Sequence, residues 1–372
     1  DQVTADLTLY AQWRDETGPD APVLQKNIVL PTGWTNAQKT IPLTIHDGVG
    51  VEQLWVSIDG GKYQKVDDFT GSVGDAPCHY EYKEVAEGAH TYRFKAVDAA
   101  GNESPESKEF KVMLDNTKPV IGTLTYENKE ANLWQYIIGK KSMIIHVPVE
   151  ETGSGVKQIS YTMTPEDAGG NPDSSKTRTK TASVANGEAQ ITFAENFKGT
   201  ITITCADTAG NAADSVTVDA SQGAKGVIVE DHAPDITTDL RENSYYDDVP
   251  AVQVKVKDDT SQTVTAGIAN VTYRVGSDVE RKITVDTSVL KTEVSFTIPA
   301  DEIPKGITTI RITAIDNAGN EASRNVTVRV KGQEATPTAS IHYLTEKLGS
   351  LVPNAEYRIN NISYRADKDG LI

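Results

Sequence analysis

One heptad occurs three times in this 372-residue chain at equal spacing. It reads AVDAAGN from Ala96 to Asn102, CADTAGN from Cys205 to Asn211, and AIDNAGN from Ala314 to Asn320. Its Asp residues, at 98, 207 and 316, are 109 residues apart in both intervals. Since a domain usually has about 100 to 150 residues, this period predicts a tandem array of three domains.

A strand is expected before each heptad Asp. The residues six, four and two positions upstream are large, large and small: Tyr92, Phe94 and Ala96, then Ile201, Ile203 and Cys205, then Ile310, Ile312 and Ala314. This alternation is typical of one buried face of a β-strand. Cys205 takes the place of an alanine, so we interpret it as a small core residue.

A second strand is expected after each heptad, with Phe110 and Val112, Val216 and Val218, and Val326 and Val328 as its apolar residues. The A-G-N sequence therefore predicts a hairpin turn. Gly would supply a positive φ, Asn would tolerate one, and the Asp would accept hydrogen bonds from the loop.

Short strands account for the rest of each repeat. The repeats open with Pro22-Val23-Leu24, Pro119-Val120-Ile121 and Pro234-Asp235-Ile236, and each contains about seven short apolar runs and no helical periodicity. Such a pattern is typical of an immunoglobulin-like sandwich. We predict an all-β chain of three tandem immunoglobulin-like β-sandwich domains in an elongated array, plus a short C-terminal β segment.

The strand, the D-x-A-G-N turn and the next strand resemble the bacterial Ig-like domains of surface proteins and secreted carbohydrate enzymes. The resemblance covers about residues 17 to 331, although the antibody disulfide is missing and Trp55 has no cysteine pair to cover. Val3–Trp13 is similar to the closing strand of internalin-type B-repeats. Ala339–Gly370 resembles the start of a small β module of clostridial-type surface proteins. These likenesses imply a large, modular, exported parent protein of Gram-positive type.

The expected modules are 1–16, the end of a B-repeat-like unit; 17–116, 117–230 and 231–331, the three Ig-like domains; and 332–372, the start of a further β module. Both chain ends fall within a pattern, which favours a segment of something longer. The stretch from Ala220 to Asp231 is expected to be a bent linker or an extended last strand of the second repeat.

Composition limits the partners. Charged residues make up 24% and hydrophobic residues 38%, as in folded soluble domains. The net charge of −17 disfavours nucleic acid and anionic membranes as partners. The sequence contains no run of about 18 apolar residues, so no membrane span is predicted. Cys78 and Cys205 fall in different repeats, so no disulfide forms within one domain.

Calcium is the one cofactor that stays open. Acidic residues near the expected junctions are Asp115, Asp231, Asp247, Asp248, Asp258 and Asp259. They do not recur in register in the sequence, so a structural turn is preferred for Asp98, Asp207 and Asp316, and no metal ligand is assigned. LPTG, from Leu30 to Gly33, lacks the rest of a sorting signal. DKDG, from Asp367 to Gly370, lacks the other ligands of a calcium loop, so a hairpin turn explains it equally well.

No catalytic or cofactor-binding residue is assigned, and the segment is predicted not to be an enzyme. The six histidines lack metal-site spacing, and no nucleophile motif occurs. His46 and His146 are expected to be partly buried strand residues.

Trp34, Trp134, Tyr245 and Tyr246 could stack on sugars, but packing at the junction with the preceding domain is preferred. The predicted function is an extracellular stalk or adhesion segment of a surface protein, at the cell surface or wall, that spaces or presents a binding or catalytic module. The alternatives are a module that binds a glycan or host protein, or an accessory region of a secreted carbohydrate-active enzyme. The chain is expected to be a monomer.

Overall fold

The computed structural model describes the chain except residues 1–13, 242–244, 259–263, 332–339, 343–346 and 361. The described part is all-β, with three single-turn 3-10 helices: η1 (Ser174–Lys176), η2 (Ala220–Gln222) and η3 (Ala300–Glu302). It divides into two compact units, Asp1–Val229 and Glu230–Ile372. Three separate hydrophobic cores occupy these units, two in the first and one in the second. The predicted fold class, tandem immunoglobulin-like sandwiches, is confirmed.

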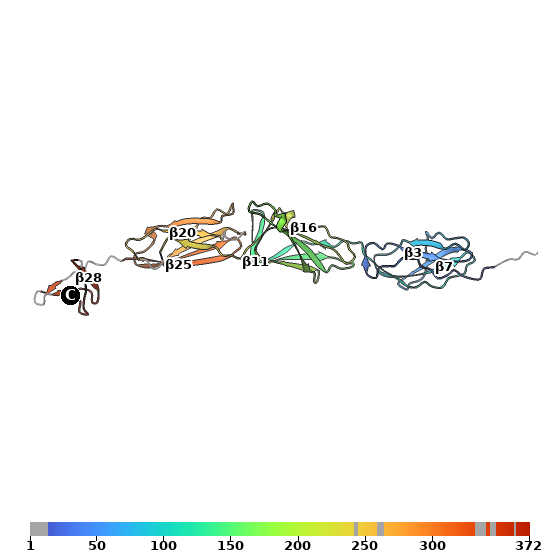
Figure 1. Cartoon of the computed structure of the whole chain (residues 1–372), viewed down its shortest axis with the longest axis horizontal. Coiled ribbons are helices and arrows are strands. Elements are labelled where there is room, and N and C mark those ends of the chain that lie inside the picture. The colour runs from blue at the N-terminus through green and yellow to red at the C-terminus, as the bar shows by residue number, and fades with distance from the viewer. Residues whose placement is uncertain (1–13, 242–244, 259–263, 332–339, 343–346, 361) are drawn as a thin grey trace, which may run out of the picture. The chain divides into compact units, whose positions relative to one another are not determined.

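Sandwich 1 contains two sheets (Figure 1). One has the order β1 (Val23–Leu24), β3 (Ile41–Ile45), β6 (Cys78–Tyr82). The other has the order β2 (Trp34–Thr35), β8 (Phe110–Leu114), β7 (Gly88–Asp98), β4 (Val51–Ile58), β5 (Gln64–Lys65). In β7 the predicted face of Tyr92, Phe94 and Ala96 is completely buried between the sheets.

Sandwich 3 repeats this topology in the second unit (Figure 1). Its first sheet is β18 (Asp235–Thr238), β20 (Val252–Lys257), β23 (Glu293–Ile298). Its second is β19 (Tyr245–Tyr246), β25 (Glu321–Val330), β24 (Ile307–Asp316), β21 (Ile268–Val275), β22 (Arg281–Ile283). The hairpin of β24 and β25 pairs up to Ile315 and Glu321, which confirms the hairpin predicted for AIDNAGN.

Sandwich 2 differs because one long strand joins its two halves. Its strands are β9 (Val120–Ile121), β10 (Thr125–Leu133), β11 (Tyr136–Glu150), β12 (Gln158–Pro165), β13 (Arg178–Ser183), β14 (Glu188–Thr192), β15 (Phe197–Cys205), β16 (Val216–Thr217) and β17 (Gly226–Val229). The start of β11 pairs in parallel with β17, and its end pairs with β14 and β9. All nine strands therefore belong to one continuous sheet around the core.

The stretch from Ala220 to Asp231 contains η2 and then β17, whose four residues are all buried. Of the two alternatives, the extended last strand is therefore correct. Cys205 is buried in the core of sandwich 2, as predicted, and both cysteines are free. His146 is a partly buried residue of β11, as expected, but His46 lies just after β3 and is exposed. The expectation for His46 was wrong because the strand ends one residue earlier.

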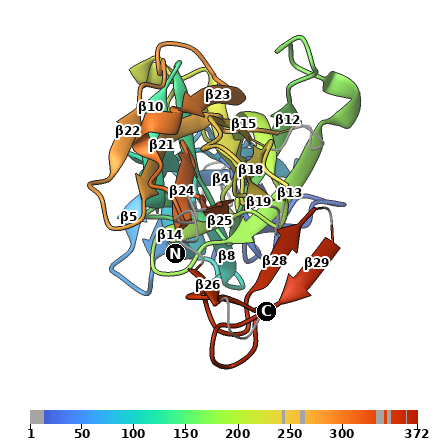
Figure 2. The same cartoon turned by 90° about the vertical axis from the view of Figure 1, so that its left-hand side faces the viewer.

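Beyond sandwich 3, the described residues form two hairpins. They are β26 (Ser340–His342) with β27 (Lys347–Gly349), and β28 (Glu356–Ile359) with β29 (Ile362–Arg365). Figure 2 shows β28 and β29 side by side. The Asp367 side chain accepts hydrogen bonds from the N–H groups of Asp369 and Leu371, so DKDG forms a turn. The likeness of Val3–Trp13 to a B-repeat lies outside the described residues.

Candidate metal centres

The repeated turn is closed by its own Asp and Asn. In sandwich 3 the Asn320 N–H donates to Asp316 Oδ1 and the Asn320 Nδ2 donates to Asp316 Oδ2, both at 2.8 Å. The same two bonds join Asn102 to Asp98 and Asn211 to Asp207, at 2.7–2.8 Å. The predicted role of the Asp as a turn acceptor is confirmed.

The glycine of the turn has the predicted positive φ, +89°, +98° and +82° at Gly101, Gly210 and Gly319. The prediction for the Asn was wrong, because its φ is not positive in any of the three turns. The Asn contributes through its side-chain amide instead, which donates to at least two acceptors in each turn.

The second acceptor of each Asn belongs to the chain that leads into the sandwich. Asn102 Nδ2 donates to Asp15 O at 3.1 Å, Asn211 Nδ2 to Asp115 O at 2.8 Å, and Asn320 Nδ2 to Glu230 O at 3.1 Å. We call Asp15, Asp115 and Glu230 the lead-in residues. Each is acidic, and each has a proline four positions later, at Pro19, Pro119 and Pro234, which is buried.

Each lead-in carboxylate belongs to an acidic triad. The triads are Asp15, Asp47 and Asp98; Asp115, Glu151 and Asp207; and Glu230, Asp258 and Asp316. Within each triad, one oxygen per residue lies within 4.8 Å of the others. In the third triad all three side chains are almost completely buried, with exposures of 1%, 0% and 2%.

The second residue of each triad, Asp47, Glu151 or Asp258, corrects an expectation from the sequence. From the sequence alone, the acidic residues near the junctions were not expected to recur at equivalent positions of the repeats. Asp47, Glu151 and Asp258 each lie two residues after the last buried residue of the preceding strand, Ile45 in β3, Val149 in β11 and Val256 in β20. Asp115 and Asp258 were among the acidic residues that the sequence singled out. Asp231, Asp247 and Asp248 are not in a triad, and Asp259 lies outside the described residues.

Two carboxylate oxygens of the triads lack a hydrogen-bond partner among the described residues. Asp15 Oδ2 and Glu151 Oε2 each expose less than 1 Å² to solvent. The other oxygen of each group is satisfied, because Asp15 Oδ1 accepts from Thr17 and Glu151 Oε1 accepts from the Gly153 N–H. A buried charged acceptor without a partner is strongly unfavourable, so each of these two oxygens requires a water molecule, a proton or a cation.

The charge of each triad adds to this requirement. Two carboxylates about 4.8 Å apart repel each other by roughly 3.5 kcal/mol at an effective dielectric constant of about 20. Burial, followed by the hydrogen bond and charge of Asp316, raises the pKa of Glu230 to about 9. Burial also raises the pKa of Asp316. The third triad therefore holds a proton at neutral pH unless a cation replaces it.

In each of the first two triads, hydrogen bonds lower the pKa of one carboxyl group. Burial acts to raise the pKa of Asp98, but the hydrogen bonds from Asn102 outweigh it and the pKa is lowered. Burial acts in the same way on Asp115, where the hydrogen bonds from Ser154 and Thr117 outweigh it. Among the described residues, no Lys, Arg or His forms an ion pair with these two triads.

The predicted aromatic residues do not form one surface. Trp34 in β2 and Tyr245 in β19 take the same place, each paired in parallel with the second-last residue of the last strand of its sandwich. Tyr245 is 59% exposed and Arg329 lies over its ring, whereas Tyr246 packs against the core of sandwich 3. Trp134 lies in the turn between β10 and β11.

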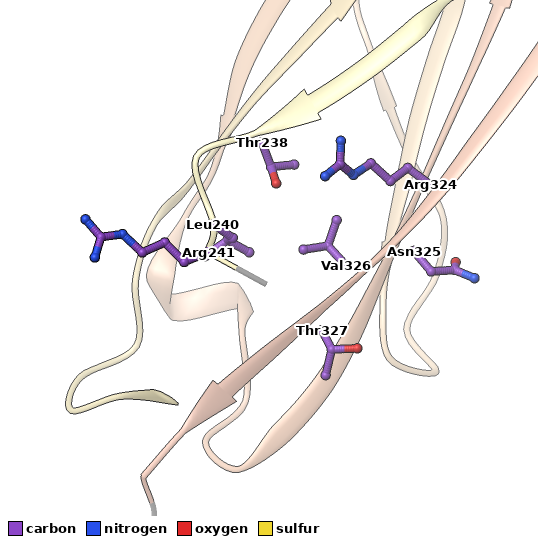
Figure 3. Close-up of a pocket in the computed structure, with 7 residues that line it drawn as sticks. All are labelled: Thr238, Leu240, Arg241, Arg324, Asn325, Val326 and Thr327. Carbon is purple, nitrogen blue, oxygen red and sulfur yellow. The ribbon is translucent and has the colours of Figure 1, made fainter. Parts of the chain in front are cut away.

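Two hollows, one on sandwich 3 and one on sandwich 1, are small. One, lined by Thr238, Leu240, Arg241, Arg324, Asn325, Val326 and Thr327, has a volume of about 170 Å³ (Figure 3). The guanidinium of Arg241 points away from it, and Arg324 Nη1 donates to Ile236 O. A second hollow of about 200 Å³ is lined by Trp55, Tyr63, Lys95, Val97 and Glu103. Both volumes are below the 300–1,000 Å³ typical of small-molecule sites.

Comparison with known proteins supports an Ig-like chain. Residues 74–169, from sandwich 1 into sandwich 2, match the family described as bacterial Ig-like domain (group 3). No curated protein matches the sequence. Among the described residues, no helix is long and apolar enough to cross a membrane.

Solved structures similar to this chain are tandem-domain proteins. The FN1–FN3 domains of chicken CNTN1 are 9% identical with a TM-score of 0.28, covering 84% of this chain and 99% of that one. A tetra-tandem repeat from the extending region of a large adhesion protein is 17% identical with a TM-score of 0.29, covering 96% and 90%. A Ca²⁺-stabilized adhesin that helps an Antarctic bacterium bind ice is 15% identical with a TM-score of 0.25, covering 91% and 85%.

Proposed function

We propose that this chain is a non-catalytic, extracellular stalk or adhesion segment of a large modular bacterial surface protein, which spaces or presents a binding or catalytic module. The observation that carries the proposal is the repeated bond from the turn Asn to the lead-in backbone carbonyl. A chain that serves as a spacer must fix the segment leading into each domain. This bond does so in all three sandwiches, and its donor is an Asn each time.

The first junction shows how this works. Asp115 follows β8 of sandwich 1, and its N–H donates to Thr35 O of that sandwich at 3.0 Å. Its carbonyl accepts from Asn211 of sandwich 2, and its side chain accepts from the Ser154 N–H at 2.7 Å. Asn36 Nδ2 also donates to Asn211 Oδ1 at 3.1 Å. One residue is therefore bonded to both sandwiches, which restricts the linker between them.

The modules expected from the sequence, 1–16, 17–116, 117–230, 231–331 and 332–372, remain part of the proposal, as does monomeric behaviour. Small-angle scattering tests the spacer role, since a compact chain of this length would have a radius of gyration of about 21 Å. We expect a value well above 21 Å. A value near it would refute the spacer role.

A second candidate function is binding of a glycan or host protein. The hollow that Trp55 and Tyr63 line on sandwich 1 favours it, because flat rings can stack on sugars and Lys95 and Glu103 could hydrogen-bond to hydroxyl groups. A glycan array with the parent chain and Trp55→Ala tests this candidate. Binding that the variant loses would support it, and an array without signal above background would refute it for glycans.

A further inference from the structure

We propose that sandwich 1 binds one neutral hexopyranose ring of a glycan in the hollow that Trp55 and Tyr63 line, and that the equivalent places on sandwiches 2 and 3 do not. The inference rests on the second candidate function, glycan binding, and names the class of sugar and the sandwich that binds it. The spacer role is independent of it, because a spacer needs no ligand.

Trp55 lies on the outer face of the five-stranded sheet of sandwich 1. Its neighbours on β4, Leu54 and Val56, are 0% and 5% exposed in the core, and successive side chains of a strand point to opposite faces. The Trp55 side chain therefore points away from the core, and the residue is only half-buried. Directly opposed residues of an antiparallel pair share a face, so Lys95, the partner of Trp55 on β7, lies beside it.

The other two sandwiches show that the fold does not require these side chains. The opposed residues at the same place carry small hydroxyl side chains: Ser160 with Thr204 in sandwich 2, and Thr272 with Thr313 in sandwich 3. Both threonines of the second strand lie three residues before the turn Asp, as Lys95 does. Trp55 thus adds an aromatic surface that the core does not use, and Trp and Tyr are the residues most enriched at binding surfaces.

The hollow has the size of a site for one ring. Its volume is about 200 Å³, and its apolar lining comes from Trp55, Tyr63 and Val97. Sites that enclose a whole ligand usually measure about 300–1,000 Å³, so this hollow fits one sugar ring while the rest of the glycan stays in solvent. The C–H face of a hexopyranose is apolar and would pack on the face of an aromatic ring.

The charges in the hollow favour a neutral ligand. Of its lining residues, Lys95 is positive and Glu103 is negative, and Lys95 Nζ lies 3.6 Å from Glu103 Oε2. Lys95 Nζ also lies over the Tyr63 ring, 5.0 Å from its centroid. A carboxylate on the ligand would meet Glu103 and the field of a chain with a net charge of −17. Acidic sugars are therefore disfavoured.

The ion pair supplies hydrogen-bonding groups for hydroxyls. An ammonium only donates and a carboxylate only accepts, whereas a hydroxyl group does both. Lys95 and Glu103, whose side chains are 28% and 66% exposed, are within reach of a ligand. With their charged atoms 3.6 Å apart, they would bind two adjacent hydroxyl groups of one ring. A neutral hexopyranose has both an apolar face and adjacent hydroxyl groups at its edge, so it matches the rings and the ion pair together.

The test is a glycan array of the 372-residue chain, followed by ligand-observed NMR titration with the methyl glycosides of glucose, galactose and mannose. Methyl glucuronide and methyl galacturonide are the acidic counterparts of two of these probes. We expect array signal for glycans that carry neutral hexoses. At least one methyl hexoside should bind in the millimolar range, and more tightly than either uronide.

Three variants locate the site. Trp55→Ser gives sandwich 1 the residue that sandwich 2 has at this place, so the Tm should stay near that of the parent while hexoside binding weakens about tenfold or more. Lys95→Thr introduces the residue of both other sandwiches and should also weaken binding. Tyr245→Ala is the matched control, because it removes an aromatic side chain that is 59% exposed on sandwich 3. It should bind like the parent.

Four results would overturn the proposal: no methyl hexoside bound in the millimolar range, binding that Trp55→Ser retains, an equal loss in Tyr245→Ala, or signal confined to acidic glycans. Acidic glycans that Trp55→Ser no longer binds would leave glycan binding at this hollow standing and refute only the neutral class. An array without signal would refute glycan binding as a whole. Scattering tests the spacer role separately, since Trp55→Ser should leave the radius of gyration unchanged.

Discussion

Replacing Asn320 with Ala isolates the contribution of the turn amide. In the parent, Asn320 Nδ2 donates to Asp316 Oδ2 at 2.8 Å, to Glu230 O at 3.1 Å and to Glu230 Oε2 at 3.2 Å. A hydrogen bond to a charged group contributes about 1.5–3 kcal/mol and one to a neutral carbonyl about 0.5–1.5 kcal/mol. The acceptors stay buried in the variant, so we expect a loss of about 2–4 kcal/mol.

Hydrogen exchange followed by mass spectrometry can localise this loss, because peptides from β24 and β25 report on sandwich 3 within the whole chain. A loss of about 2–4 kcal/mol corresponds to exchange that is roughly 30-fold to 700-fold faster, at 1.4 kcal/mol per factor of ten. Chelator is present throughout, so that cation binding does not contribute. Peptides from sandwich 1 should not change.

Asn325→Ala is the matched control, since Asn325 lies on β25, the strand that follows Asn320, with an exposed side chain. Its exchange should stay within a few-fold of the parent, as for surface substitutions generally. If Asn320→Ala also exchanged within a few-fold of the parent, the bond to the lead-in residue would contribute no stability, and the argument for a fixed lead-in segment would fail.

Three further outcomes follow from the contacts in sandwich 2. The hydrogen bond to Glu188 raises the pKa of His146 above its ordinary value of 6.5. The pair therefore stabilises the fold below about pH 6.5, and this stabilisation is lost as the pH rises through the folded-state pKa. Glu188→Gln should flatten the dependence of Tm on pH between about 6 and 8. Gly153→Ala would place a Cβ 2.5 Å from Asp115 Oδ2, and overpacking of this kind costs about 1–3 kcal/mol, measured by denaturant unfolding. Cys205→Ala should cost only about 1 kcal/mol in the same assay, because the other two repeats place an alanine there.

Each of these outcomes can be contradicted. An unchanged pH dependence in Glu188→Gln would exclude the ion pair as its cause. A Gly153→Ala chain of parental stability would mean that Asp115 can move away at no cost. A loss of several kcal/mol in Cys205→Ala would show that the thiol packs more tightly than its position predicts.

The sequence predicted the strands and the turn because both follow from local pattern. Tyr92, Phe94 and Ala96 alternate with period two, and the turn glycine must take a positive φ, so neither depends on distant residues. The long β11 was not predicted, because its bridging position depends on pairing with both β17 and β14.

The triads escaped prediction because their members are far apart in sequence. The segment between each of these acids and the glycine that begins the next strand region has a different length in each repeat: 3 residues from Asp47 to Gly50, 4 from Glu151 to Gly155 and 9 from Asp258 to Gly267. A search for the 109-residue period cannot align them. Counting from the last buried residue of the preceding strand would have aligned these three acids. Each lead-in residue is marked by a different signal, an acid four residues before a proline.

The parallel strand pair of each sandwich has a mechanical consequence. β2 pairs in parallel with β8, β11 with β17 and β19 with β25, so an early strand lies beside the last strand of each sandwich. Tension applied to the two ends of a sandwich would pull these partners in opposite directions, and their hydrogen bonds would bear the load together instead of breaking one after another. Sandwich 2 has four paired residues there and the other two sandwiches have two, so sandwich 2 should withstand the largest force before it unravels.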